Sequence, residues 1–352
     1  MKTFNENFIT DFRKNTENRM PDFNNLLKVL SKQKPDRYTL FEFFLNDELE
    51  TYVTGVPTPK DIIEYQTRRV EAFRICGYDY ITMHPSGFNF NSQSSNHGKK
   101  SRSANDDISF CDREGFENFI WPDPKDYDCS VLDKITKILP GNMKIIIHGP
   151  GGVLENVIDL VGYDNLCYML VDDPELVQMI FDKVGSSLEE YYRMAVGHPG
   201  VGAAISNDDW GFFSQTMLST EDMKKYVLPW HQKISDVIHK SGKPAILHSC
   251  GQVEKMMPDI CKLYEGKHSY EDKILPVENA YDIYHDKIAI LGGIDLDFVC
   301  RKTPQEIYER SCKMLEKTQD KGGYALGSGN SIPYYVPFEN YLAMISAATV
   351  NS

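Results

Sequence analysis

Residues 245–251 read Ala-Ile-Leu-His-Ser-Cys-Gly, an apolar run that ends in a histidine and a cysteine. If the run forms a strand, side chains two residues apart point the same way, so His248 and Cys250 share one face. An imidazole and a thiol at a strand end can hold zinc, which favours nitrogen and sulfur ligands. A buried histidine beside an inert cysteine explains the pair equally well, because a lone H-x-C motif is much less specific than paired C-x-x-C motifs.

Other apolar runs also end in polar side chains that can do chemistry. Their ends carry His84, His148, Asp208 with Asp209, Glu278, Asp295, and Ser328 with Asn330. Any one of these is explained by a helix cap or a satisfied buried polar group. Parallel barrels, however, build their active sites at the carboxyl ends of the strands. The coincidence of so many polar ends therefore predicts a ring of functional side chains at one barrel mouth.

Short apolar runs alternate with helical patterns of ten or more residues, which indicates a parallel β/α architecture. Seven runs are expected to be strands, near residues 78–83, 143–147, 201–205, 244–247, 273–277, 288–291 and 324–326, and an eighth near 119–121. This number favours an α/β fold of the (β/α)8 TIM barrel type over an open sheet. No G-x-G-x-x-G follows the first strand, so a dinucleotide-binding fold lacks its main support.

The chain before the barrel is expected to form an N-terminal helical extension. Residues 1–60 are assigned to this extension and residues 61–352 to the (β/α)8 barrel. A helix-like pattern at 40–45 lies within the extension. Residues 86–107 are rich in Asn, Ser and Gly, and predict a long polar loop that is either a mobile lid or disordered.

Composition narrows the class of partner. The net charge of −13 argues against nucleic acid or an anionic membrane surface as the main partner. No apolar run approaches the roughly 20 residues of a membrane span, and the N-terminus lacks the apolar core of a signal peptide. The 8 cysteines have no framework spacing, so we expect reduced thiols and a cytoplasmic location.

The residues predict roles within the ring. Glu278 lies on the strand predicted to follow His248 and Cys250, and a carboxylate oxygen is an acceptable third zinc ligand that leaves one position open for catalysis. A salt bridge or helix cap is an equally good explanation of Glu278. His148, Asp208 and Asp209 are the candidates for acid, base or substrate anchor. Candidate substrate-binding residues are His84, Trp210 and Asn330.

Several motifs together resemble the uroporphyrinogen decarboxylase superfamily, in its zinc- and corrinoid-dependent methyltransferase branch, which includes the coenzyme M methyltransferases. These motifs are L-H-S-C-G at 247–251, L-G-G-I-D at 291–295, G-S-G-N-S-I at 327–332, P-F-E-N at 337–340 and D-D-W-G at 208–211. The resemblance extends from about residue 36 to the C-terminus and is more specific in the second half.

The resemblance implies a (β/α)8 barrel that moves a methyl group to or from a corrinoid held on a separate protein. His248 and Cys250 match two zinc ligands of the branch that acts on coenzyme M. The later ligand cysteine of that branch would fall near residues 328–330, where this chain has no thiol. This departure puts thiol-acceptor chemistry in doubt. The decarboxylases carry an Arg-rich N-terminal motif, which has no counterpart around Arg37.

The sequence thus predicts a zinc-dependent methyltransferase that demethylates a small methylated substrate and passes the methyl group to a corrinoid (cobalamin) protein. Three alternatives stay open. The first is a thiol methyltransferase that uses a zinc-activated thiolate, and the second is a metal-free decarboxylase that uses Asp208 or Asp209. The third is a non-catalytic binding barrel in which the H-x-C pair is structural.

Overall fold

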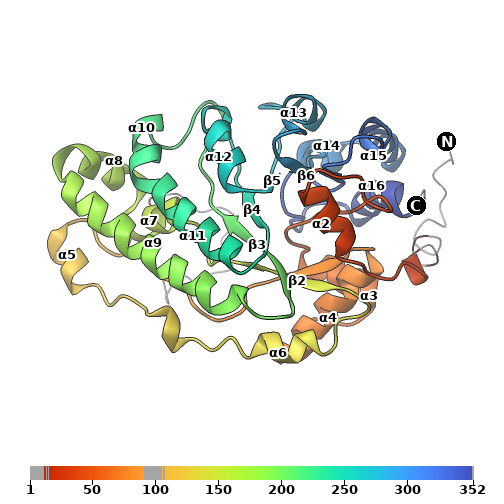
Figure 1. The fold of residues 1–352 in the computed structure, drawn as a ribbon, viewed down its shortest axis with the longest axis horizontal. Helices are drawn as coiled ribbons and strands as arrows, with labels where there is room; N and C mark the ends of the chain where they lie inside the picture. The colour runs from red at the N-terminus through yellow and green to blue at the C-terminus, as the bar shows by residue number, and fades with distance from the viewer. Residues whose placement is uncertain (1–11, 13, 15, 91–104, 106–107, 351–352) are drawn as a thin grey trace.

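The computed structural model describes residues 12, 14, 16–90, 105 and 108–350 (Figure 1). Its strands are β1 (Tyr80–Met83), β2 (Lys144–His148), β3 (Val201–Asn207), β4 (Ala245–His248), β5 (Gly266–His268), β6 (Ala289–Leu291) and β7 (Tyr324–Ala325). The main helices are α2 (Asn24–Leu30), α3 (Asp47–Thr54), α4 (Ile62–Ile75), α5 (Arg113–Asn118), α6 (Val131–Thr136), α7 (Val153–Val161), α8 (Tyr163–Asp172), α9 (Pro174–Val196), α11 (Leu228–Lys240), α12 (Met257–Leu263), α13 (Val277–Tyr284), α14 (Leu296–Arg301), α15 (Pro304–Thr318) and α16 (Phe338–Val350). Shorter helical segments are η1 (Pro124–Asp126), α10 (Thr220–Asp222), η2 (Met223–Val227) and η3 (Glu254–Met256).

The strands of the described residues form one parallel, curled seven-stranded sheet in the sequential order β1 to β7. Helices lie around the outside of this sheet (Figure 1). Strands covered on both faces are mostly apolar, and the burial of β1, β4 and β6 is complete. The predicted parallel α/β architecture is therefore confirmed.

A segment before α3 lies between the first and last strands of the sheet. Leu40 bridges to Leu326, just beyond β7, and the amide of Phe41 donates to the carbonyl of Leu326 at 2.8 Å. On its other side, the Thr82 hydroxyl of β1 donates to the Phe43 carbonyl at 2.6 Å. The helix predicted at 40–45 is wrong, because this backbone is extended and bonds to both edges of the sheet.

Two predicted strands are also wrong. Residues 119–121 contain no strand, and Ile120 is 90% exposed while Phe119 and Trp121 pack in an aromatic cluster with Phe110. Residues 273–277 form a turn that leads into α13, and the strand after β4 is instead β5. The apolar run at 119–121 thus contributes to an aromatic cluster, and the run at 273–277 leads into a helix.

The predicted lid at residues 86–107 lies largely outside the described residues, and the boundary at residue 60 stays a prediction. No helix in the described part of the chain combines the length and apolar character needed to cross a bilayer.

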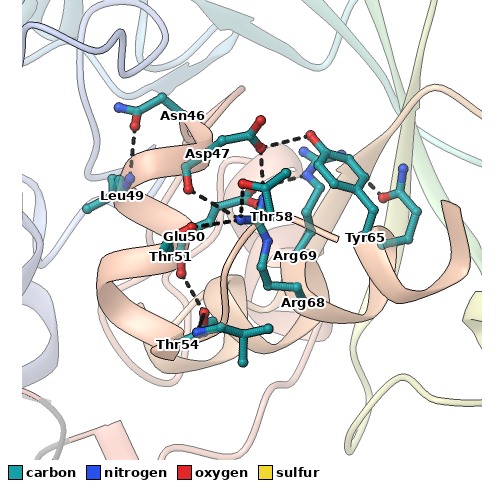
Figure 2. Close-up of polar contacts among 12 residues, drawn as sticks. Asn46, Asp47, Leu49, Glu50, Thr51, Thr54, Thr58, Tyr65, Arg68 and Arg69 are labelled. Atoms are coloured by element: carbon teal, nitrogen blue, oxygen red, sulfur yellow. Dashed lines mark hydrogen bonds and ion pairs between the residues drawn. The ribbon is translucent and has the colours of Figure 1, made fainter. Parts of the chain in front are cut away.

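A buried ion network fixes α3 against α4 (Figure 2). Glu50 accepts hydrogen bonds from Arg68 at 2.9 Å and from Arg69 at 3.1 Å, and Arg68 also reaches Asp47 at 2.8 Å. Glu50 and Arg68 have side chains only 1% exposed. Because α3 directly follows the extended segment at 39–45, this network also anchors the segment that lies beside β1.

Replacing Glu50 with glutamine is expected to destabilise the protein by about 3–5 kcal/mol, because it leaves two buried guanidinium groups without their shared carboxylate. Urea unfolding monitored by circular dichroism measures the loss. Glu48→Gln on the exposed face of the same helix is the matched control and should stay within about 0.5 kcal/mol of wild type. Equal stabilities for Glu50→Gln and Glu48→Gln would contradict the proposed anchoring.

Candidate metal centre

Adjacent strand ends bring three potential metal ligands together. One ligand atom each of Asp209, His248 and Cys250 lies within 4.8 Å of the others. His248 is the last residue of β4, and its Nε2 is 3.8 Å from the Cys250 Sγ. Asp209 comes from the loop after β3, the strand paired with β4. The prediction that His248 and Cys250 lie on one face is confirmed.

The loop that presents Cys250 has a shape that only glycine allows. Gly251 has a φ of +78°, and a Cβ there would lie 2.0 Å from the Gly211 carbonyl oxygen. The close approach of these two loops brings the Cys250 amide to Asp209 Oδ1, to which it donates at 2.8 Å. Asp209 thus stabilises the cysteine loop and contributes a carboxylate to the same cluster.

The Cys250 sulfur is surrounded by polar groups. The Ser269 hydroxyl donates to it at 3.3 Å and the Asn330 amide at 3.2 Å. Burial, followed by the nearby Asp209 carboxylate, raises the pKa of the Cys250 thiol far above its ordinary value. Burial also raises the pKa of Asp209. A cation at this point would therefore offset the cost of ionising both groups.

His248 and a second histidine form a buried pair. The Nδ1 atoms of His248 and His268 are 2.8 Å apart, and His268 Nε2 is 3.1 Å from the Ser328 carbonyl oxygen. Burial, assisted by His268, lowers the pKa of His248 well below its ordinary value. Burial lowers the pKa of His268 to about 3. Both imidazoles are neutral at physiological pH, which is the form that binds a metal.

The carboxylate expected from Glu278 is not at this cluster. Glu278 lies in the first turn of α13, where Arg310 donates to its two oxygens at 2.9 and 3.0 Å. Burial opposes ionisation there, but the hydrogen bonds from Arg310 keep the pKa of Glu278 below its ordinary value. Glu278 was predicted at the cluster because a strand was expected at residues 273–277. The strand that follows β4 is instead β5, which ends at His268. The carboxylate that lies beside His248 and Cys250 is that of Asp209.

Asp208 is buried within the protein and does not face solvent at the end of the sheet. It is 0% exposed, and its oxygens accept hydrogen bonds from the amides of Leu154 and Glu155. Asp208 Oδ2 also accepts from the Trp210 indole at 3.0 Å and lies 2.8 Å from His231 Nε2. Trp210 is itself 0% exposed. Both side chains are thus buried and hydrogen-bonded within the protein, and their expected roles in catalysis and substrate binding stay predictions.

The remaining predicted residues lie at the same end of the sheet. The His148 ring is 5.7 Å from His84, and the Phe43 ring contacts His148 at 5.3 Å and His248 at 4.7 Å between centroids. Burial and the nearby His84 lower the pKa of His148 to about 3. His148 Nδ1 faces the Gly149 carbonyl oxygen at 3.1 Å, so it carries the proton and leaves Nε2 as an acceptor.

Sequence reasoning missed His268 and Ser269, which contact the cluster, and Glu42, which holds Ser328. Glu42 is fully buried and accepts hydrogen bonds from the amides of Ser328 and Phe43. His268 and Ser269 follow a run that is too short and too polar to be recognised as a strand. A search for every histidine within the second half of the chain would have named His268 as a candidate.

The donor set fits zinc. Imidazole nitrogen, thiolate sulfur and carboxylate oxygen are all zinc ligands, and three protein ligands with one open position are typical of catalytic zinc sites. Thiolate and carboxylate together balance the charge of Zn²⁺. The Asn330 amide, which donates to the Cys250 sulfur at 3.2 Å, lies next to this donor set.

Comparison with known proteins gives relatives of two activities. A methylated-thiol–coenzyme M methyltransferase of Methanosarcina mazei is 25% identical over 240 residues, which cover 66% of this chain and 61% of that protein. A uroporphyrinogen decarboxylase of Citrifermentans bemidjiense is 28% identical over 178 residues, or 50% of each chain. The matched regions thus span between half and about three fifths of these relatives.

The fold and the family profile agree with these relatives. A solved structure of a methyltransferase from Methanosarcina mazei has a TM-score of 0.68 to this chain, covers 92% of it and 97% of its own chain, and is 17% identical, which shows a shared TIM-barrel-like fold. The profile described as uroporphyrinogen decarboxylase (URO-D) matches residues 113–350. Since this match covers more than half of the sequence, the chain belongs to the uroporphyrinogen decarboxylase family.

Proposed function

We propose that this protein is a zinc-dependent methyltransferase that moves a methyl group from a small methylated substrate to a corrinoid carried by a partner protein. The observation that carries the proposal is the convergence of Asp209, His248 and Cys250 at the mouth of the sheet. The similarity to a methylated-thiol–coenzyme M methyltransferase supports methyl transfer over decarboxylation.

The three ligand side chains would hold the metal. Zinc bound there supplies a Lewis acid for the heteroatom that loses its methyl group. Asp209 has a second role, because its hydrogen bond to the Cys250 amide fixes the loop that carries the thiol. This arrangement makes the site rigid before substrate arrives, so that the chain itself provides the positioning.

His148, His84 and Asn330 are the residues that we assign to the substrate. His148 presents Nε2 as a hydrogen-bond acceptor and, with its lowered pKa, stays neutral at physiological pH. It is therefore suited to accept a hydrogen bond from substrate rather than to donate one. Asn330 is assigned because its amide donates to the Cys250 sulfur at 3.2 Å, which places it beside the ligand cluster. Phe43 and Phe44, stacked at 3.9 Å between centroids, both pack against the His148 ring.

The purified protein is expected to contain about one zinc per chain and to transfer methyl groups from methylated thiols to reduced free cobalamin. Metal content is measured by mass spectrometry, and methyl transfer by the absorbance change of the cobalamin. Removing zinc with a chelator should abolish the transfer, and adding zinc back should restore it. Full activity in the chelated protein, or porphyrinogen decarboxylation without zinc, would contradict the proposal.

A further inference from the structure

His268 lies behind His248, on the side away from Cys250. It is the last residue of β5, is 0% exposed, and pairs in register with His248 of β4. Its two ring nitrogens face two different groups: Nδ1 faces His248 Nδ1 at 2.8 Å, and Nε2 faces the Ser328 carbonyl oxygen at 3.1 Å. Neither the family resemblance nor the pattern of apolar runs in the sequence predicted a role for His268.

The neighbours of His268 determine where its proton lies. A carbonyl oxygen only accepts hydrogen bonds, so His268 Nε2 must carry a proton and donate it to Ser328. A buried neutral imidazole has only one N–H, so His268 Nδ1 presents a lone pair. The 2.8 Å contact between the two Nδ1 atoms then requires the proton on His248 Nδ1. His248 Nε2 is left with a free lone pair, directed toward Cys250 Sγ at 3.8 Å.

We infer that His268 is a positioning residue that holds His248 in the Nδ1-protonated tautomer, with Nε2 available as a metal ligand. The metal-binding part of this inference rests on the proposed function. The tautomer itself does not, because it follows from the hydrogen-bond partners of the two rings. Histidine ligands of zinc in general depend on such an outer hydrogen bond for their orientation and basicity.

The surroundings hold the His268 ring in the required place. Gly292, with a φ of +67°, passes so close that a Cβ would lie 2.9 Å from His268 Nε2 and 2.2 Å from the Ser328 carbonyl oxygen. The Phe41 ring contacts the imidazole at 5.0 Å between centroids. Glu42 in turn fixes Ser328 through its amide, at 3.2 Å, and its hydroxyl, at 2.8 Å. The carbonyl that orients His268 is therefore itself immobilised.

The first test reads the tautomer directly. In metal-free wild-type protein labelled with ¹⁵N-histidine, two-bond ¹H–¹⁵N correlations should show His248 protonated at Nδ1 and unprotonated at Nε2. A His248 resonance pattern of the Nε2-protonated form would overturn the inference. If the expected tautomer is found in a protein that neither binds zinc nor transfers methyl groups, the proposed function fails and this inference stands.

The second test compares two replacements of His268. His268→Gln keeps an acceptor for His248 and a donor for Ser328, whereas His268→Leu removes both. Zinc affinity, measured by chelator competition, should fall about 10–100-fold in His268→Leu and stay within a few-fold of wild type in His268→Gln. Equal losses in the two variants would reduce His268 to a packing role and overturn the inference, as would an unchanged affinity in His268→Leu. His285→Gln, directly after α13 and outside the cluster, is the matched control.

Discussion

Replacing Cys250 with serine is expected to lower the zinc content of the purified protein from about one per chain to nearly zero, and to abolish methyl transfer. Serine is close in size, but its hydroxyl does not ionise at physiological pH, so the site loses its only thiolate. The affinity should fall by more than about a hundredfold, the upper end of what losing an outer-shell partner costs. Metal analysis and chelator competition measure this loss.

The control is Cys261→Ser on α12, whose half-buried thiol is outside the cluster.

The same measurement of zinc affinity tests which carboxylate, Asp209 or Glu278, is a metal ligand. Asp209→Asn should weaken zinc binding while keeping the hydrogen bond to the Cys250 amide, because an amide oxygen accepts it equally well. Glu278→Gln should leave the affinity unchanged, because Arg310 occupies both of its oxygens. Unaltered zinc content in Cys250→Ser, or a larger loss in Glu278→Gln than in Asp209→Asn, would contradict the ligand assignment.

The sequence predicted the parts of the site that follow from strand ends. His148 and His248 end apolar strands, and His84 and Asp209 follow others, so the carboxyl ends of a parallel sheet had to gather them at one mouth. The spacing of two residues was enough to place His248 and Cys250 together, because β4 is a regular strand that continues into a glycine turn.

The parts of the site that the sequence did not predict depend on a strand that has no apolar pattern. β5 is three residues long and has a lysine at its centre, whose buried ammonium donates to the carbonyls of Ser249 at 3.2 Å and Ser269 at 2.6 Å. These hydrogen bonds exist only once the neighbouring loops are in place, so no local periodicity reports them. The strand was therefore assigned too late in the chain, and Glu278 instead of Asp209 was predicted to lie beside His248 and Cys250.

The segment at residues 39–45 shows that the prediction of the fold from sequence has the same limit. Leu40, Phe41, Phe43 and Leu45 are all buried, so their pattern has the spacing of either a short helix or a strand covered on both sides. The choice is made by long-range hydrogen bonds to residues 82, 326 and 332. Only contacts across most of the chain length distinguish the two, and a window of six residues contains none of them.

Replacing Glu42 with glutamine is expected to remove a pH dependence of stability between about pH 5 and pH 8. Burial raises the pKa of Glu42 from 4.5 to about 8, against hydrogen bonds from Ser328 that oppose the shift. The bonding pattern agrees with a protonated carboxyl. The Ser328 hydroxyl has one proton and contacts both the Asn330 carbonyl and Glu42 Oε1, so satisfying both contacts requires Glu42 to donate.

The sign of the effect follows from linkage. Above pH 4.5 the unfolded chain ionises Glu42 while the folded protein keeps it protonated until about pH 8. Its contribution to stability is therefore complete below pH 4.5 and declines by about 1.4 kcal/mol per pH unit until the pKa of the folded state is reached. Glutamine mimics the protonated carboxyl and cannot ionise, so the Glu42→Gln variant should gain stability relative to wild type as the pH rises.

Urea unfolding of both proteins at pH 5, 6, 7 and 8 measures this difference. Only the difference between wild type and variant is interpreted, because other buried groups, such as Glu155 with its raised pKa, titrate in both proteins and cancel. Glu48→Gln, at an exposed position on α3, is the control for exchanging a carboxyl for an amide. A difference between wild type and Glu42→Gln that stays constant across this range would mean that Glu42 is ionised in the folded protein. Ser328 would then donate to Glu42 instead, and its contact with the Asn330 carbonyl would lack a proton.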